Sequence, residues 1–430
     1  MKIFNSRNKN FIKELKIFLD KRHEDSNIKI DKKVKNIIQK VKLEGDKALF
    51  DYTKKFEGIS LNKKNILINT NNYKKNKKIN KKVKISFKKA IQNITNFHKK
   101  QLPKNYSIVQ NKTKIGSIWK PIDSVGIYVP GGKSVYPSSL IMSLIPAKVA
   151  GVKRIVVATP TFNKKINPYI LYLLDLLGVK EAYRIGGAQA IAALAFGTKS
   201  IEPVNKIFGP GNAYVASAKK QVFGKVGIDL IAGPSEIVIL AGDQNNPKWV
   251  AADLIAQAEH DERAQSILIT NSKLFAKKVS ENLKILIKTF PKKNIILKSL
   301  KNFGAIIIID NFSQAHKIIN LIAPEHLHLQ NKESIKIYDK ISNAGAIFIG
   351  EYSAEAYGDY VVGTNHILPT SGSAKFSSGL GVLDFMKRTS YVKMNKKSSN
   401  NLEKYVSSIS SIENLKGHEF SVKIRQKDKK

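Results

Sequence analysis

Short apolar runs that alternate with helix-like stretches constrain the fold of this chain more than any other feature. A first series of runs, each followed by a Gly- or Pro-marked turn, covers Ser124–Val129, Arg154–Ala158, Glu181–Ile185 and Asn205–Gly209. A second series covers Ser235–Gly242, Ser266–Thr270, Gly304–Ile309 and Ala346–Gly350. Strands that alternate with helices form parallel sheets covered by helices. The pattern therefore predicts two α/β lobes.

The chain lacks the signatures of a membrane or disulfide-bonded protein. It has no run of eighteen apolar residues, and its N-terminus has no uninterrupted apolar stretch of the kind found in secretory signals. Cysteine is absent, which excludes disulfides, cysteine metal sites and cysteine nucleophiles. We expect a cytoplasmic protein with no membrane partner.

The net charge of +41 comes from 74 Lys and Arg against 33 Asp and Glu. One interpretation is nucleic-acid binding. The other is compositional drift, because the excess is mainly Lys and accompanies abundant Asn and Ile, as in KKNKKINKKVK at 74–84. No aromatic residues interleave with these lysines as a base-stacking surface requires. We therefore expect no specific nucleic-acid partner.

Four Gly-rich turns follow strand-like runs, at Val129–Pro137, Ile185–Ala190, Phe208–Val215 and Ala232–Glu236. Gly lets backbone N–H groups approach an anion, and ligands of parallel sheets bind at the carboxyl ends of strands. None of the turns matches G-x-G-x-x-G or a P-loop. The pattern leaves two interpretations of these turns. They bind a nucleotide or phosphate, or they are ordinary tight turns.

Polar side chains gather in a few short stretches. Gln257 and His260 lie one turn apart at the end of a helix expected over Asn246–His260, and Glu325 directly precedes His326. The remaining stretches of this kind contain Asp359 with His366, and Glu413 with His418. Imidazole, carboxylate and amide groups suit Zn²⁺ or a similar divalent ion, and a Glu–His pair can move protons. Taken alone, each stretch has a second interpretation, in which its polar residues have no role in a site.

The blocks GGAQAIAALAFGT, FGPGNAYVASAKKQV, IDLIAGPSE, QAEHDERA, APEHL and GDYVVGTNHILPT occur in this order. Together they closely resemble the histidinol dehydrogenase family, from about Asp46 to His418. The resemblance implies a homodimer with one Zn²⁺ per subunit. It also implies the last step of histidine biosynthesis, in which L-histidinol is oxidised to L-histidine through a bound aldehyde and two NAD⁺ are reduced.

The resemblance also implies a role for individual residues. The zinc ligands would be Gln257, His260, Asp359 and His418, the last from the other subunit, and the catalytic pair would be Glu325 and His326. NAD⁺ would contact Tyr128, Gln189 and Asn212. The substrate would contact Ser235, Gln257, His260, His326, Asp359, His366, Glu413 and His418. Glu259 would be structural.

The absence of cysteine bears on the second oxidation. A thiohemiacetal route is closed, so the aldehyde must be hydrated before it loses a second hydride. We expect His326 to accept the proton in both oxidations and Glu325 to assist the addition of water. His328 stands where the family leads us to expect an acidic residue, and the Lys-rich N-terminal region is also atypical.

The fold class that we expect is α/β, with two doubly wound, incomplete Rossmann-like parallel-sheet lobes and small helical extensions at both ends. The expected divisions are an N-terminal extension (1–24), a larger domain with the metal and catalytic residues (25–127 with 237–380), a second domain with the NAD-binding turns (128–236) and a C-terminal dimer arm (381–430).

Three rival functions remain open. One is a paralogous zinc and NAD⁺ dehydrogenase that oxidises another small amino or sulfo alcohol to the acid. The second is a basic nucleic-acid-binding protein, which would need a patch that binds polyanions at physiological salt. The third is a metal-dependent hydrolase, which would turn over without NAD⁺.

Overall fold

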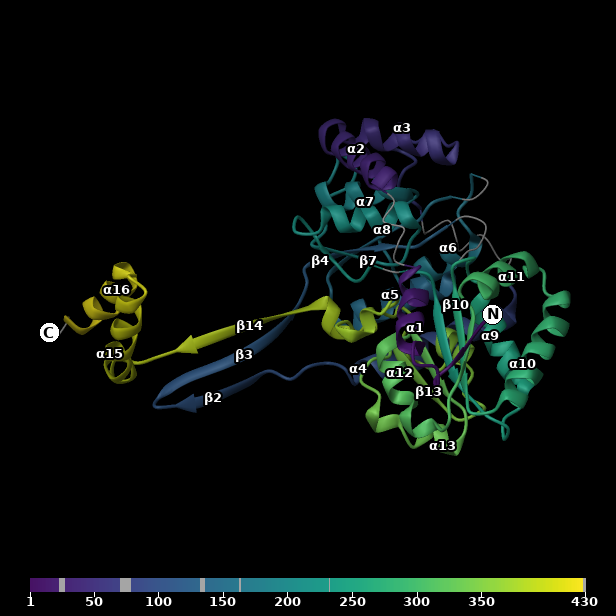
Figure 1. Ribbon diagram of the computed structural model, residues 1–430. Helices are drawn as coiled ribbons and strands as arrows, with labels where there is room; N and C mark the ends of the chain where they lie inside the picture. Colours follow the sequence, from purple (N-terminus) through teal and green to yellow (C-terminus); the bar gives the residue numbers. More distant parts are fainter. Residues whose placement is uncertain (23–27, 70–78, 132–135, 162–163, 232, 428–430) are drawn as a thin grey trace.

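The computed structural model describes residues 1–22, 28–69, 79–131, 136–161, 164–231 and 233–427. Two parallel sheets with helices on their faces form the body, and a narrow antiparallel arm extends from it (Figure 1). Within the described ranges, no helix is both long enough and apolar enough to cross a membrane.

The larger sheet has six parallel strands in the order β1-β11-β10-β9-β12-β13. Their bounds are β1 (Lys2–Asn5), β9 (Glu236–Leu240), β10 (Gln265–Thr270), β11 (Ala305–Ile308), β12 (His326–Leu329) and β13 (Ala346–Ile349). From β9 the chain winds outward through β10 and β11, then returns to the other side of β9 for β12 and β13. This confirms a doubly wound lobe.

Helices cover both faces of the six-stranded sheet because its strands are apolar on both sides. Val238 and Leu240 of β9 pack toward α1 and α12, and Ile237 and Ile239 pack toward α9, α10 and α11. The helices are α1 (Phe11–Asp20), α9 (Pro247–Ala258), α10 (Lys273–Leu286), α11 (Lys293–Asn302), α12 (Ala315–Ile322) and the short α13 (Lys332–Ile335).

The second sheet has five parallel strands in the order β6-β5-β4-β7-β8. Their bounds are β4 (Ser124–Tyr128), β5 (Arg154–Ala158), β6 (Glu181–Tyr183), β7 (Lys206–Phe208) and β8 (Gly227–Ile228). The winding again reverses beside the first strand, between β4 and β7. The lobe is therefore a second doubly wound sheet, as predicted.

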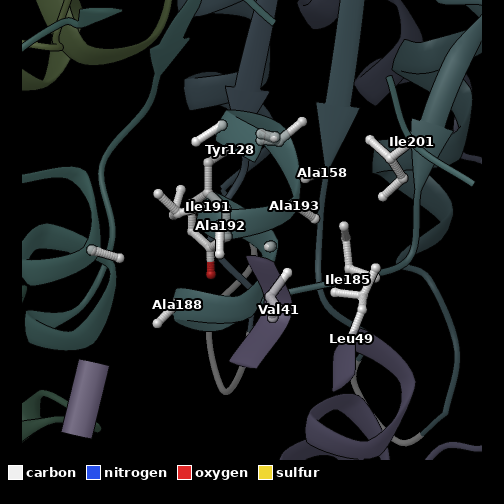
Figure 2. Close-up of a cluster of buried hydrophobic side chains, with 14 of the residues drawn as sticks. Val41, Leu49, Tyr128, Ala158, Ile185, Ala188, Ile191, Ala192, Ala193 and Ile201 are labelled. Carbon is white, nitrogen blue, oxygen red and sulfur yellow. The ribbon is translucent and has the colours of Figure 1, made fainter. Parts of the chain in front are cut away.

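Two groups of helices cover the five-stranded sheet. On one face lie α4 (Lys81–Lys99), α5 (Pro137–Ala150) and α6 (Pro168–Leu176). On the other lie α2 (Ile28–Glu44), α3 (Asp46–Glu57), α7 (Gly187–Phe196) and α8 (Ala213–Val222). Figure 2 shows Val41 and Leu49, from α2 and α3, in the same buried cluster as Ile191 and Ala192 of α7.

The packing of the N-terminal third differs from the expected division of the chain. Helices α2 and α3 pack on the five-stranded sheet, whereas the sequence grouped 25–127 with 237–380. An amphipathic helix reveals that it buries one face, but its sequence does not reveal against which sheet. In addition, the expected helical extension 1–24 contributes strand β1, which pairs with β11 at the edge of the six-stranded sheet.

The arm is a three-stranded antiparallel sheet that carries two helices at its far end (Figure 1). It consists of β2 (Tyr106–Gln110), β3 (Thr113–Pro121), β14 (Met386–Lys393), α15 (Lys396–Ile412) and α16 (Lys416–Lys427). Every residue of β2 is exposed, so this edge of the arm lacks a partner within the described chain.

Candidate active site

The candidate site lies at the amino ends of two neighbouring strands in the six-stranded sheet. Glu236 begins β9, and His326 begins β12, whose first residue pairs with Ile237. Helix α9 runs back across this sheet, so its last turn brings Gln257 and then His260 to the same edge. Strand order and helix direction thus bring together residues that are far apart in the sequence.

A cavity of about 650 Å³ opens beside this edge. His260 and Tyr360 line it from the larger domain, and Pro137 and Ile141 of α5 line it from the five-stranded domain. The site therefore faces the junction of the two α/β domains.

His326 is buried among three carboxyl groups. Its Nδ1 lies 2.9 Å from the backbone carbonyl oxygen of Glu236, while its Nε2 has no hydrogen-bond partner. Nε2 is 3.5 Å from the carboxylate of Asp359, and Nδ1 is 3.7 Å and 3.8 Å from those of Glu325 and Glu355. Burial alone would lower the pKa of His326, but the surrounding carboxylates outweigh it and raise that pKa well above its usual value.

Glu325 is held beside His326 in a nearly water-free position. The backbone N–H of Glu236 donates to its Oε2 at 2.9 Å. Burial raises the pKa of the Glu325 carboxyl to about 8, although the nearby His326 acts in the opposite direction. Such a carboxyl can exchange a proton near neutral pH, which suits acid–base chemistry.

Gln257 contacts a carboxyl group that sequence reasoning did not single out. With its amide oriented to satisfy both neighbours, Gln257 donates to the two carboxylate oxygens of Glu355 at 2.8 and 2.9 Å, and its oxygen accepts from the backbone N–H of Glu236 at 2.9 Å. Burial raises the pKa of Glu355 well above its usual value. Glu355 begins α14 (Glu355–Tyr360), one helical turn before Asp359, and that i, i+4 spacing was the available signal.

Asp359 and His366 are linked through the backbone. The Nδ1 of His366 donates to the carbonyl oxygen of Asp359 at 2.7 Å, and its Nε2 lies 3.1 Å from the hydroxyl of Ser139 in α5. Burial lowers the pKa of both His366 and His260. Burial opposes ionisation of Asp359, yet the imidazole of His326 more than offsets this and lowers its pKa. Burial thus favours neutral rings at His260 and His366, whereas the contact between His326 and Asp359 favours a charged imidazole and an ionised carboxylate.

Three other residues predicted for the site lie at its margin or away from it. Ser235 directly precedes β9, and its carbonyl oxygen accepts from the N–H of Gln265. Glu413 follows α15, and His418 lies in α16. Because both helices sit at the end of the arm (Figure 1), one chain does not bring Glu413 and His418 to His326.

The residues predicted to contact a cofactor lie at the carboxyl edge of the five-stranded sheet. The hydroxyl of Tyr128 accepts from the N–H of Gly187 at 3.1 Å, and Gln189 is buried with its Oε1 unpaired. Asn212 caps α8 by accepting from the N–H groups of Tyr214 and Val215. Residues 132–135 and Ala232, from two of the four Gly-rich turns, lie outside the described residues, as do residues 74–78 of the Lys-rich stretch 74–84.

His328 does not face solvent. Its Nε2 lies 2.8 Å from the carbonyl oxygen of Gly350, and its Nδ1 is 3.5 Å from the carboxylate of Asp253 and 3.3 Å from the amide nitrogen of Gln330. The side chain is fully buried in a polar network next to the site. The acidic residue expected at this position would place two carboxylates together there.

The chemistry of the donor groups fits a zinc ion that takes one ligand from outside this cluster. Among the described residues, no group of three or more His, Cys, Asp and Glu side chains is placed to hold a metal. This does not conflict with the expected ligands from the two α/β lobes of one chain. They are Gln257, which supplies an amide oxygen, and just two residues of the His, Cys, Asp and Glu types, His260 and Asp359. Burial keeps His260 in the neutral form that a metal requires.

The fold and the site define a two-lobed, doubly wound α/β protein with a buried imidazole–carboxylate centre where its domains meet. The family model for histidinol dehydrogenase matches residues 20–426, and the chain belongs to that family. This confirms the resemblance found in the sequence.

Individual relatives agree with the family model. The chain is 47% identical over 412 residues to the histidinol dehydrogenase of Clostridium acetobutylicum, covering 95% of each chain. It is 47% identical over 395 residues to that of Rhizobium meliloti, covering 91% of each. The crystal structure of histidinol dehydrogenase from Elizabethkingia anophelis matches with a TM-score of 0.93 at 34% identity, over 99% of this chain and 98% of that one.

Proposed function

We propose that this protein oxidises L-histidinol to L-histidine with two NAD⁺ and one Zn²⁺ per site, as the last step of histidine biosynthesis. The observation that carries the proposal is His326, beside the buried carboxyl of Glu325. Its Nδ1 is held by a carbonyl, and its Nε2 makes no hydrogen bond among the described residues but lies 3.5 Å from the carboxylate of Asp359. The nearby carboxylates favour the charged ring, so Nε2 first gives up its proton. In the neutral ring Nε2 can then accept a proton, and with the adjacent carboxyl it can serve two successive proton removals.

His326 and Glu325 divide the proton transfers between them. In the first oxidation, Nε2 of His326 accepts the hydroxyl proton of the alcohol. Hydride leaves the carbon that carries this hydroxyl, which gives the aldehyde. Glu325 then takes a proton from the water whose oxygen adds to the aldehyde carbon, while His326 returns its proton to the aldehyde oxygen. This gives the hydrate and leaves His326 neutral again. In the second oxidation, His326 accepts a hydroxyl proton of the hydrate as the second hydride leaves, giving the carboxylic acid.

The metal ligands proposed are Gln257, His260 and Asp359 from one chain and His418 from another. Zinc, when bound, orients the imidazole and amino nitrogens of the substrate. Holding the aldehyde in the site favours the second step, because a positioned reactant gains a large effective concentration. Ser235, His366 and Glu413 are the further substrate contacts proposed.

The cofactor contacts proposed are Tyr128, Gln189 and Asn212. NAD⁺, when bound, accepts the hydride in each oxidation. The unpaired Oε1 of the buried Gln189 supports this placement. Burial raises the pKa of Tyr128 to about 12, so its phenol stays a neutral hydrogen-bonding group.

A homodimer is part of the proposal, as is a cytoplasmic location. The arm carries His418 away from its own body, and α15 and α16 leave apolar side chains exposed, including Ile409, Ile412 and Phe420. Exposed apolar surface of this kind is typical of an interface. A second copy that accepted the arm would bury these side chains and gain the fourth metal ligand.

The direct test is the yield of NADH per L-histidinol consumed, with substrate limiting, before and after chelation. We expect two NADH per substrate, loss of activity on chelation and recovery on adding zinc. One NADH with released aldehyde would contradict the role of Glu325 and His326 in a second oxidation. The absence of NADH from folded, zinc-loaded protein would contradict the substrate and favour another small alcohol.

A further inference from the structure

A buried ion pair lies directly behind the catalytic residues. Nη1 of Arg22 donates to Oε1 of Glu236 at 2.5 Å, and both side chains are only 3% exposed. Nη2 of Arg22 donates to the carbonyl oxygen of Pro234 at 2.7 Å, and Nη1 also reaches Gln265 at 3.3 Å. A buried ion pair often stabilises a fold no more than apolar side chains of similar volume would. A gain in stability therefore does not by itself explain why Arg22 and Glu236 are paired here.

Glu236 connects this ion pair to both catalytic residues. Its backbone N–H donates to the carboxylate of Glu325, and its carbonyl oxygen accepts from Nδ1 of His326, each at 2.9 Å. Its side chain accepts from the backbone N–H of Glu325 at 3.3 Å and from that of Ser371 at 2.7 Å. A shift of Glu236 would therefore displace both proposed catalytic residues, Glu325 and His326.

Arg22 donates hydrogen bonds to the chain on both sides of Ser235. One half of its planar guanidinium holds the carbonyl of Pro234, and the other holds the side chain of Glu236. This forked geometry fixes the direction in which the chain enters β9, which a single point charge would not do.

We propose that Arg22 is a positioning residue, which locks Glu236 so that its peptide holds Glu325 and keeps the proton of His326 on Nδ1. This inference rests on the catalytic roles proposed for Glu325 and His326. It assigns a function to Arg22, which precedes the sequence blocks quoted for the resemblance and lies near the start of the region that the family model matches. When the ring is neutral, a displaced Glu236 carbonyl would allow the proton onto Nε2, and the base would be lost.

The experiment compares three variants as zinc-loaded full-length proteins. Arg22→Met removes the guanidinium, and Arg22→Met/Glu236→Met removes both charges. Arg7→Met is the matched control, because Arg7 forms an exposed ion pair with Asp310 in the same N-terminal region. For each we would measure Tm, zinc content, kcat and the KM values for L-histidinol and NAD⁺.

We expect Arg22→Met to lower kcat roughly 10- to 100-fold while both KM values change less than about threefold, since small misplacements of reacting groups cost this much. The double variant should regain most of the lost Tm, because no unpaired charge stays buried, but not the lost kcat. If kcat recovers together with Tm, the pair is merely structural and the proposal fails. If Arg22→Met does not fold, the double variant decides alone.

A second measurement separates this inference from the proposed function. In protein labelled with ¹⁵N-histidine, the ring signals of His326 report which nitrogen carries the proton, and His326→Asn assigns them. At an alkaline pH where the ring is neutral, we expect Nδ1–H in the wild type and a mixture in Arg22→Met. An unchanged signal would contradict the inference, whereas failure of the wild type to oxidise L-histidinol would contradict only the proposed function.

Discussion

Nδ1 of His326 lies 2.9 Å from the backbone carbonyl oxygen of Glu236. A carbonyl oxygen only accepts hydrogen bonds, so in the neutral ring this contact places the proton on Nδ1 and leaves Nε2 as the base. Nε2 makes no hydrogen bond within the described residues and lies 3.5 Å from the carboxylate of Asp359. The backbone of strand β9 thus selects the tautomer of the neutral His326 ring on the neighbouring strand β12.

Replacing His326 with Asn should abolish turnover with little change in fold. The Asn amide nitrogen can still donate to the carbonyl of Glu236, but nothing replaces Nε2. We expect kcat to fall by roughly 10²- to 10⁴-fold, the range typical of a lost general base. Steady-state NADH formation measures this, with His316→Asn as the control, since His316 lies at the surface with its Nδ1 2.9 Å from the carbonyl oxygen of Ser313. Retention of more than a tenth of the activity would exclude His326 as the base.

The carboxyl of Glu325 should make the stability of the metal-free protein depend on pH. Its pKa is 4.5 in the unfolded reference and about 8 in the folded state, so the folded state binds its proton more tightly. The stabilisation is fully present below pH 4.5 and is lost as the pH rises through about 8. Between pH 6 and 9, the Tm of the wild type should therefore fall several degrees more than that of Glu325→Gln.

Thermal melts across this pH range measure the effect, and Glu333→Gln serves as the control. Glu333 forms only an exposed ion pair with Lys336, so its replacement should leave the pH dependence unchanged. Parallel Tm curves for the wild type and Glu325→Gln would show that Glu325 titrates normally in the folded protein.

The sequence predicted the two doubly wound lobes because their βα alternation is local. Motifs such as APEHL and QAEH keep several candidate residues adjacent, so the sequence could propose them before the fold placed them at one edge of the sheet. The sequence did not predict Arg22 or Glu236, which are 214 residues apart and meet only through the fold. Strand β1 was also missed, because four residues with the burial pattern of Lys2–Asn5 carry no clear periodicity.

The turn that contains Gly209 should tolerate no side chain. Gly209 has φ +110°, and a Cβ there would lie 2.1 Å from the carbonyl oxygen of Tyr128. We expect Gly209→Ala to raise the KM for NAD⁺ at least about tenfold and to lower Tm, because the strand end that carries Tyr128 must shift. Gly224→Ala is the matched control, since Gly224 has φ +96° but no neighbour within 4 Å. Equal effects of the two substitutions would point to backbone strain alone.

Mixing two inactive variants should restore activity if His418 acts on another subunit. His260→Asn removes a proposed metal ligand from the body, and His418→Asn removes the proposed ligand in α16 at the end of the arm (Figure 1). A hybrid dimer would contain one intact site, with His260 from one subunit and His418 from the other. In an equal mixture assembled at random, half of the dimers are hybrids, so about a quarter of wild-type activity should return.

NADH formation after subunit exchange, with zinc bound per protein measured in parallel, tests this arrangement. Zinc content should recover in step with activity, because the same hybrid site restores both. A mixture of His260→Asn with Gln257→Ala is the control. Both changes affect the body of the chain, so no hybrid contains an intact body to combine with an intact arm. Each hybrid would then carry two damaged sites and stay inactive. If the His260→Asn and His418→Asn mixture also remained inactive after proven exchange, His418 would have to serve its own chain or no metal at all.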